Sequence, residues 1–451
     1  MRGVASKVAC LVGLGVLVLT VVAGPASAAP AGVLDPTWGS GGVVMPHLYS
    51  GQTLCSFPPG GSYACGPAEG VAAIDAHDGR VYLASPYLPP SGPQQVAVLA
   101  YGPSGSLDPS FGHGGSVVFD AATAADDISL SHLVLQPGPN GTEYVGWYDT
   151  AGARIVRLAP NGSVDTSFAS HGQVSLPTGT TTTPLRWMPM KAGPGGSLTI
   201  GFSLLANAAW RDGVLRLRPY GTPDPTFGAG GVVAFASPPA VGAPLIDLAV
   251  TGSGRVFALL GTRNGPAGTG AVVAITAQGA LDPAFGNHGF ADPFGAEPLD
   301  ALAVDSAGRP LVMTSVSLPG STQVLLVTRL RSDGGADPTF GVGGTFGLGL
   351  GGQELQDSQI ALDAQGRPVL TLSDYDGRTT SAGVARLTPN GSLDPTFGPG
   401  PHPGVDLLPL PGFSALALGA DGRIYLGASE APAGPQLDPR NLYLIGLVAN
   451  P

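Results

Sequence analysis

A short phrase that recurs seven times is the strongest constraint on how this chain can fold. Its fullest form is Leu-Asp-Pro-Thr-Phe-Gly at residues 393–398, and every copy has a glycine three residues before its aspartate. Successive aspartates are 73, 57, 59, 58, 55 and 57 residues apart. A near-constant spacing indicates repeated supersecondary units. The repeat motif comprises Asp35 and Trp38, Asp108 and Phe111, Asp165 and Phe168, Asp224 and Phe227, Asp282 and Phe285, Asp337 and Phe340, and Asp394 and Phe397.

Three apolar runs separated by turns lie between successive copies. Residues 416–418 and 423–426 flank an Asp-Gly turn, which is a hairpin signal. A third run, such as 384–387, enters a Pro-Asn-Gly turn, and the phrase with the residues after it supplies a fourth strand. Four-stranded antiparallel sheets repeated radially form a β-propeller.

The ends of the chain complement each other in this scheme. After residue 28 the chain opens on a fourth-strand phrase, and it closes on first, second and third strands at 415–419, 423–427 and 442–448. We therefore predict an all-β, seven-bladed β-propeller of four-stranded antiparallel blades. The N-terminal strand completes the last blade and closes the ring, which removes exposed sheet edges. A linear β-solenoid, the alternative, would have no use for complementary ends.

Glycine and proline account for 71 and 45 of the 451 residues, a content that approaches that of disordered chains. Disorder also needs low hydrophobicity and high net charge, whereas 43% of this chain is hydrophobic and 11% is charged. Because glycine and proline are the poorest helix formers, the same composition favours strands joined by tight turns. Many of these glycines and prolines recur at the same positions relative to the motif.

The N-terminus predicts export. Arg2 and Lys7 precede an apolar run from Val8 to Ala23, and a small-residue cleavage pattern ends at Ala28. The run is shorter than the roughly 20 residues that span a bilayer, which disfavours the alternative of a membrane anchor. We expect a signal peptide at 1–28, cleaved near Ala28, and a single propeller domain at 29–451 without a membrane span. The protein would be secreted, either extracellular or at the cell envelope.

Charge and cysteine content narrow the partners. The net charge of −11 becomes −13 without the signal segment, because 18 basic and 31 acidic residues remain. Such a chain lacks the basic surface that nucleic acid requires, and it does not suit an anionic membrane. Cys55 and Cys65 remain in the exported part, where an even count favours one disulfide. Two free thiols are the alternative.

The phrase Gly-x-Leu-Asp-Pro-Thr-Phe-Gly and its period resemble the delta-60 repeat, a bacterial β-propeller repeat, over residues 32–451. The sequence departs from that pattern at Trp38, Thr166, Ala169 and in its long first spacing. The resemblance implies an exported or surface propeller. The family has no established common activity, so the resemblance implies no substrate.

The repeated residues favour structural roles. One aromatic ring per blade can wedge between neighbouring sheets, and a ligand-stacking site is the alternative. An aspartate before Pro-Thr can accept hydrogen bonds from its own turn, which favours a turn role over a carboxylate-lined pore. The arginines that begin second strands are expected to be solvated or to pair between blades, rather than to bind anions. These arginines are Arg80, Arg255, Arg309, Arg367 and Arg423.

We predict no catalytic residue, no metal and no cofactor. None of the seven histidines shows a metal-ligand spacing. Residues 347–352 match the letters GxGxxG but have no following helix, and residues 374–377 resemble only the start of a calcium loop. An enzyme on this fold would need clustered acid, base or metal groups at the axis, and a buried histidine–carboxylate cluster there would favour one.

The variable connections between strands carry the candidate binding residues, because exposed aromatic and arginine side chains are common recognition anchors. We expect a non-enzymatic binding scaffold, a monomer, with an unknown protein or glycan ligand at the cell envelope. One alternative is an extracellular lyase or hydrolase with an axial site, and another is that these residues only pack their own loops. The candidates are Tyr87, Trp147, Tyr148, Trp187, Trp210, Arg211, Arg263, Tyr375 and Arg378.

Overall fold

The structure is a computed structural model. It describes residues 17–18, 34–47, 73–87, 95–120, 133–149, 152–177, 189–206, 209–236, 243–261, 270–295, 297, 299–317, 323–349, 354–355, 359–375, 380–398, 403–408, 415–428 and 443–448. The chain divides into two compact units, each considered by itself here. The expectation of one domain over 29–451 stays a prediction.

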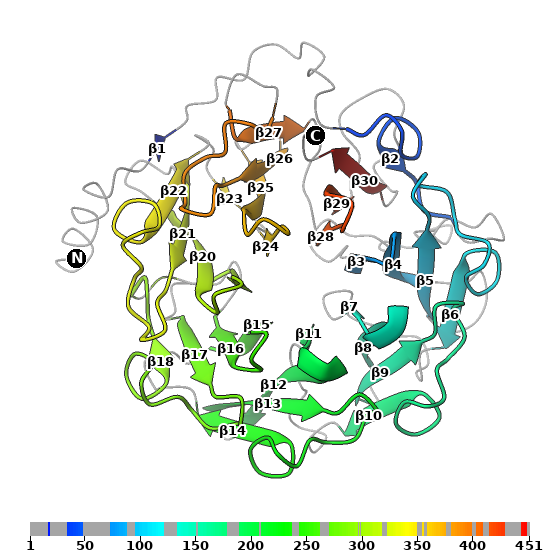
Figure 1. Ribbon diagram of the computed structural model, residues 1–451, viewed down its shortest axis with the longest axis horizontal. Helices are drawn as coiled ribbons and strands as arrows, with labels where there is room; N and C mark the ends of the chain where they lie inside the picture. Colours follow the sequence, from blue (N-terminus) through cyan, green and yellow to red (C-terminus); the bar gives the residue numbers. More distant parts are fainter. Residues whose placement is uncertain are drawn as a thin grey trace, which may run out of the picture. The chain divides into compact units, whose positions relative to one another are not determined.

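The four-blade unit comprises Val33–Ala236 and Phe413–Ala449. Its sheets have the orders β3-β4-β5-β6, β7-β8-β9-β10, β11-β12-β13-β14 and β28-β29-β30-β2, all antiparallel (Figure 1). Single 3-10 turns, η2 (Pro139–Gly141) and η3 (Pro194–Gly196), join the first two strands of two blades. The strands are β2 (Val43–Val44), β3 (Ala73–His77), β4 (Arg80–Tyr87), β5 (Gln95–Tyr101), β6 (Ser116–Asp120), β7 (Val134–Pro137), β8 (Glu143–Asp149), β9 (Gly152–Leu158), β10 (Gln173–Pro177), β11 (Met190–Ala192), β12 (Leu198–Ala206), β13 (Ala209–Leu217), β14 (Val232–Ala236), β28 (Ala415–Leu418), β29 (Arg423–Ala428) and β30 (Tyr443–Val448).

The three-blade unit comprises Met1–Gly32 and Ser237–Gly412. Its sheets have the orders β15-β16-β17-β18, β19-β20-β21-β22 and β24-β25-β26-β27. Two short strands extend them: β1 pairs in parallel with β22, and β23 pairs with β25. The strands are β1 (Leu17–Val18), β15 (Leu245–Val250), β16 (Val256–Leu260), β17 (Ala271–Ile275), β18 (Phe290–Ala291), β19 (Ala301–Val304), β20 (Pro310–Ser317), β21 (Gln323–Arg329), β22 (Thr345–Gly349), β23 (Glu354–Leu355), β24 (Ile360–Leu362), β25 (Pro368–Tyr375), β26 (Thr380–Arg386) and β27 (Val405–Leu408).

The predicted fold class is confirmed: the chain is an all-β, seven-bladed β-propeller of four-stranded antiparallel blades. The N-terminal strand completes the last blade, because Val43 and Val44 of β2 pair with Ile445 and Leu444 of β30. In the four-blade unit the first strands β28, β3, β7 and β11 are in contact in that order.

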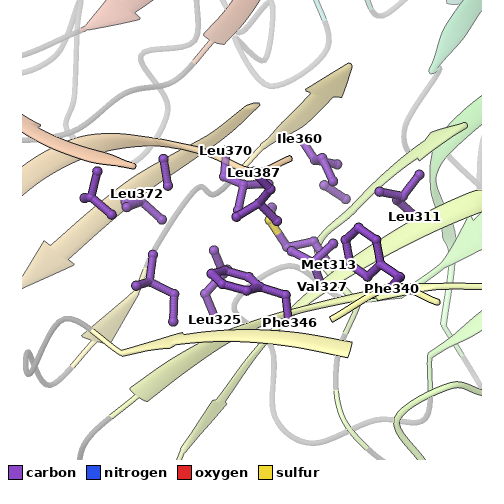
Figure 2. Packing of buried hydrophobic residues seen from close by; sticks show 14 residues of the cluster. Leu311, Met313, Leu325, Val327, Phe340, Phe346, Ile360, Leu370, Leu372 and Leu387 are labelled. Carbon is purple, nitrogen blue, oxygen red and sulfur yellow. The ribbon is translucent and has the colours of Figure 1, made fainter. Parts of the chain in front are cut away.

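Within each unit the hydrophobic core lies between neighbouring blades, where facing sheets bury apolar side chains against one another. One cluster joins Met313 and Leu325 of one blade to Leu370 and Leu372 of the next, with Phe340 among them (Figure 2). The motif aromatic is fully buried in all seven copies. Each such ring stabilises the fold by roughly 2–3 kcal/mol through burial alone.

The motif aspartate holds its own turn. Oδ1 of Asp394 accepts hydrogen bonds from the backbone N–H and the hydroxyl of Thr396, at 3.0 and 2.7 Å. Its Oδ2 accepts from Nε of Arg386 at 2.8 Å. Burial alone would raise the pKa of Asp394, but the hydrogen bonds from Thr396 and the charge of Arg386 hold the pKa below its usual value. Asp35, Asp108, Asp165, Asp224 and Asp337 repeat this turn and this pKa direction.

In other blades the guanidinium that binds the motif aspartate also contacts the next blade. Arg329 donates to Asp337 at 2.9 Å, to the hydroxyl of Thr339 at 2.9 Å, and to the carbonyl of Pro389 in the following blade at 2.6 Å. Its guanidinium carbon lies 4.8 Å from the centre of the Phe340 ring. We call this set of contacts the inter-blade clamp. Arg80, Arg157 and Arg423 make the same three kinds of contact, with Pro160, Pro219 and Pro103 as the acceptors in the next blade.

The clamp arginine comes from either of two strands. In three blades the arginine stands at the start of the second strand, as Arg80 does. The third-strand position that carries an arginine in the other blades then holds a small residue, such as Ala100, which pairs with Tyr82. In the other four blades the third strand carries the arginine that lies near the motif turn: Arg157, Arg216, Arg329 and Arg386. Of these, Arg157 and Arg329 donate to a carbonyl of the next blade, whereas Nη1 of Arg386 has no hydrogen-bond partner among the described residues. Arg309 and Arg367 bind Asp305 and Asp363 of their own turns as well as the motif aspartate.

Glycine is required where the turn before the motif touches the neighbouring blade. Gly105 has φ of 77°, and a Cβ there would lie 2.5 Å from the backbone nitrogen of Gly39. That nitrogen donates to the carbonyl of Ser104 at 2.7 Å. Any side chain at Gly105 would therefore separate two blades as well as strain the turn.

Replacing a motif aromatic should destabilise the protein strongly. Phe227 is fully buried, with the guanidinium carbon of Arg216 4.0 Å from its ring centre. We expect Phe227→Ala to lower the free energy of unfolding by about 3–5 kcal/mol, because it leaves a cavity. Thermal melting measures this, with Tyr220→Ala as the control because Tyr220 is 70% exposed. Equal melting temperatures for the two variants would contradict a core role.

The clamp should depend on the fork of the guanidinium and not only on its charge. We expect Arg329→Lys to cost about 1.5–3 kcal/mol, because one ammonium cannot reach all three acceptors. Arg331→Lys is the matched control, since Arg331 is exposed and, among the described residues, its side chain pairs with Asp333 of its own turn. Denaturant unfolding of both variants tests this, and a fully stable Arg329→Lys would argue against the clamp.

Candidate functional site

A histidine and two carboxylates meet between two blades of the four-blade unit. Asp75 and His77 lie on β3, and Glu143 is the first residue of β8 in the next blade. Nδ1 of His77 is 2.6 Å from Oδ2 of Asp75 and 3.4 Å from Oε2 of Glu143. We call these three residues the carboxylate–histidine cluster.

The strand geometry brings the three groups together. Residues two apart on a strand point to the same face, so Asp75 and His77 share one face of β3. Strand β3 is in contact with β7, the first strand of the blade that contains Glu143. The sequence separation of 66 residues between His77 and Glu143 is therefore closed by the packing of neighbouring blades.

Glu143 occupies a position that is apolar in every other blade. It pairs with Leu158, the third-strand residue that bridges to the motif of its own blade. The register of the other sheets, read the same way, gives the equivalent residues. They are Val81, Leu198, Val256, Pro310, Pro368 and Ile424, and all six are buried.

The environment of Glu143 strongly disfavours its charge. The residue is 1% exposed, and among the described residues neither carboxyl oxygen has a hydrogen bond of good geometry, although the Gln136 backbone and the Asp75 carboxyl lie nearby. Burial, followed by the nearby Asp75 carboxylate, raises the pKa of Glu143 well above its usual value. An acid in such a place is costly unless another group compensates for it.

His77 is held in a fixed orientation. Its ring stacks on Tyr82, with centroids 4.8 Å apart and planes 19° apart. The hydroxyl of Tyr82 donates to Asp78 at 3.2 Å and accepts from Arg80 at 3.4 Å. Burial raises the pKa of Tyr82, so its hydroxyl stays protonated. Nε2 of His77 is buried without a hydrogen-bond partner in the described part of the chain.

The cluster offers one imidazole nitrogen and two carboxylate oxygens, the donor types that bind divalent ions or exchange protons. These ligand atoms all lie within 4.8 Å of one another. Sequence reasoning missed the cluster because it searched for ligand spacings within short segments. An acidic residue at a repeat position that is otherwise apolar was the signal that could have found it.

Two of the predicted binding residues are buried in the structure. Tyr87 and Trp147 were expected in exposed connections, but they lie in β4 and β8 and are 5% and 2% exposed. Trp147 stacks on Phe119 of the neighbouring blade at 5.7 Å between ring centres. Both side chains belong to clusters of buried hydrophobic residues, so they contribute to the packing of the fold.

The other candidates lie on strands or outside the described residues. Trp210 and Arg211 begin β13, where Arg211 is exposed, and Tyr375 ends β25. Tyr148 lies in β8. Three candidates, Trp187, Arg263 and Arg378, lie outside the described residues. The predicted disulfide of Cys55 and Cys65 lies outside them as well.

A second buried acid, Asp406, is not part of such a cluster among the described residues. Asp406 of β27 is 6% exposed, and its Oδ2 has no hydrogen-bond partner among the described residues. Burial raises its pKa to about 6. We attach no ligand to this residue, because burial alone accounts for the shift.

Asp406 gives the protein a measurable pH dependence. Its pKa is higher in the folded state, so folding gains from its protonation in acid and loses this gain as pH rises from about 4 to about 6. We therefore expect Asp406→Asn to melt above the wild type at pH 7.5, with the difference shrinking toward pH 4. Asp120→Asn, a change at an exposed residue, is the control. A difference independent of pH would contradict the burial of an ionisable group here.

Comparison with known proteins agrees with the fold. The family described as "Domain of unknown function (DUF5122) beta-propeller" matches residues 145–168 and 373–397, each ending at a motif aromatic. No curated protein is significantly similar in sequence. Among the described residues, no helix has the length and apolar character needed to cross a membrane.

Several solved structures match this chain at low identity and low TM-score. A polysaccharide lyase, Uly1, is 13% identical with a TM-score of 0.45, covering 90% of this chain and 94% of its own. The PQQ-bound aldose sugar dehydrogenase of Streptomyces coelicolor is 15% identical with a TM-score of 0.37, covering 69% and 93%. Regucalcin, a calcium-binding protein of Agrobacterium tumefaciens, is 13% identical with a TM-score of 0.36, covering 68% and 83%. Likeness at this level carries no argument about activity.

Proposed function

We propose that this protein is a secreted, non-enzymatic bacterial β-propeller of the delta-60 type. It acts as a monomeric binding scaffold for a protein or glycan ligand at the cell envelope. The signal-like segment 1–28 and the motif support export and the family.

One observation carries the proposal: the charged and polar residues that repeat in the sequence bind one another within the fold. The motif aspartate, its neighbouring hydroxyl and the clamp arginine bind one another and the next blade, as with Asp337, Thr339 and Arg329. A ring of identical charged residues is thus accounted for by blade assembly. Recognition then depends on residues that differ between blades, which is usual for a rigid scaffold with variable connections.

The hairpin of β12 and β13 is the best-supported binding element. Both strands are nine residues long, and pairing with β14 ends at Arg211. Among the described residues, Trp210 pairs with Leu205 and has no partner in β14. A tryptophan beside an exposed arginine is a residue pair favoured in recognition surfaces.

A capture experiment tests this role. The full mature chain is immobilised and exposed to native cell-envelope extract, alongside Trp210→Ala and Tyr375→Ala variants. We expect a retained ligand whose recovery falls in at least one variant. Tyr220→Ala is the control, because Tyr220 is an exposed aromatic in a turn before the motif. Identical recovery with all four proteins would exclude these hairpins as the binding surface.

The carboxylate–histidine cluster favours a second candidate, an extracellular lyase or hydrolase. Its buried glutamic acid and oriented histidine on a first strand are the kind of groups that acid–base catalysis uses. Turnover of envelope glycans or peptides by the wild type, abolished in His77→Phe, would select the enzyme. Ligand capture without turnover would select the scaffold.

A further inference from the structure

We propose that Asp75, His77 and Glu143 bind one divalent transition-metal ion, Zn²⁺ in the first instance, between two neighbouring blades. The proposal goes beyond the binding role above, because it assigns a ligand class to a site away from the β12–β13 hairpin.

The donor set points to this class of ion. One imidazole nitrogen and two carboxylate oxygens are common ligands of Zn²⁺, whereas Ca²⁺ and Mg²⁺ prefer oxygen alone. Asp75 and His77 are each about one-sixth exposed, at 17% and 16%, so the cluster borders the solvent. Three protein ligands with one open position is a recurrent zinc arrangement.

Glu143 supplies the independent observation. It is 1% exposed, faces His77, and has no hydrogen bond of good geometry to either oxygen within the described ranges, although the Gln136 backbone and the Asp75 carboxyl lie near enough to influence its pKa. Six equivalent positions accept an apolar side chain, so the fold itself does not require an acid there. A cation between the two blades would compensate for a carboxylate that is otherwise unfavourable.

The present distances are close to those of a coordinated ion. Bonds of about 2.0–2.2 Å to one centre separate ligand atoms by roughly 3.2–3.6 Å in a tetrahedral site. Nδ1 of His77 and Oε2 of Glu143 are already 3.4 Å apart. Nδ1 and Oδ2 of Asp75 are hydrogen-bonded at 2.6 Å, so that contact must open slightly as the ion replaces the shared proton. Because both carboxyl groups bind the ion as carboxylates, any proton that they carry passes to solvent on binding.

The test measures zinc bound to the full mature chain made without a polyhistidine tag. We expect equilibrium dialysis against ZnCl₂ to give one ion per chain. We also expect a rise in melting temperature that EDTA reverses. Co²⁺ should give visible d–d absorption that Zn²⁺ removes. Glu143→Gln and His77→Phe should each weaken binding by about 100-fold or more.

The two variants separate loss of the ion from loss of the fold. Glutamine matches the shape of a neutral glutamic acid, so metal-free Glu143→Gln should melt at or above the wild-type temperature. Phenylalanine keeps the ring that stacks on Tyr82. His288→Asn is the control that should bind like the wild type, because His288 is exposed and belongs to the three-blade unit. Absence of stoichiometric zinc, tighter binding of Ca²⁺ than Zn²⁺, or unchanged binding in folded Glu143→Gln would each overturn the proposal.

Discussion

The ion pair between the motif aspartate and the clamp arginine is the interaction on which the rest of the structure depends. The aspartate fixes its own turn with one oxygen and the guanidinium with the other, as Asp394 does with Thr396 and Arg386. The guanidinium lies over the motif ring and donates to a carbonyl of the next blade, as Arg329 does to Pro389. One buried pair therefore sets both the end of a blade and its distance from its neighbour. Because such a pair is costly when broken, it favours a single arrangement of the sheets.

The sequence predicted the blades because their information is local. Turn residues and apolar alternation repeat in register, and the pairing of Val43 with Ile445 followed from complementary ends. The origin of the clamp arginine could not be predicted in the same way. Arg80 lies on a second strand and Arg157 on a third strand, yet each binds a motif aspartate and a carbonyl of the next blade. Neighbouring strands place either side chain over the same turn. The two positions are equivalent because both bring the guanidinium to the same place in the folded blade, which the sequence pattern alone does not show.

The candidate site was missed for a related reason. His77 and Glu143 are far apart in the chain and belong to different blades, so no local spacing connects them. The burial of Tyr87 and Trp147 was missed because strand ends were read as connections. The residues shared by all blades of a repeat fold hold the blades together. A function specific to one protein is therefore expected at positions that differ from the repeat. Glu143 is such a departure, with an acid where six blades bury an apolar side chain.

The central claim is that the fold accounts for its repeated charges and leaves the Asp75–His77–Glu143 cluster as a site for a ligand. Anomalous X-ray scattering at the zinc absorption edge, from crystals of the full mature chain grown with Zn²⁺, tests it most directly. The account predicts one strong anomalous peak within about 2.0–2.2 Å of Nδ1 of His77 and of one oxygen from each carboxylate. A map without density there, or with zinc only at exposed histidines, would contradict it.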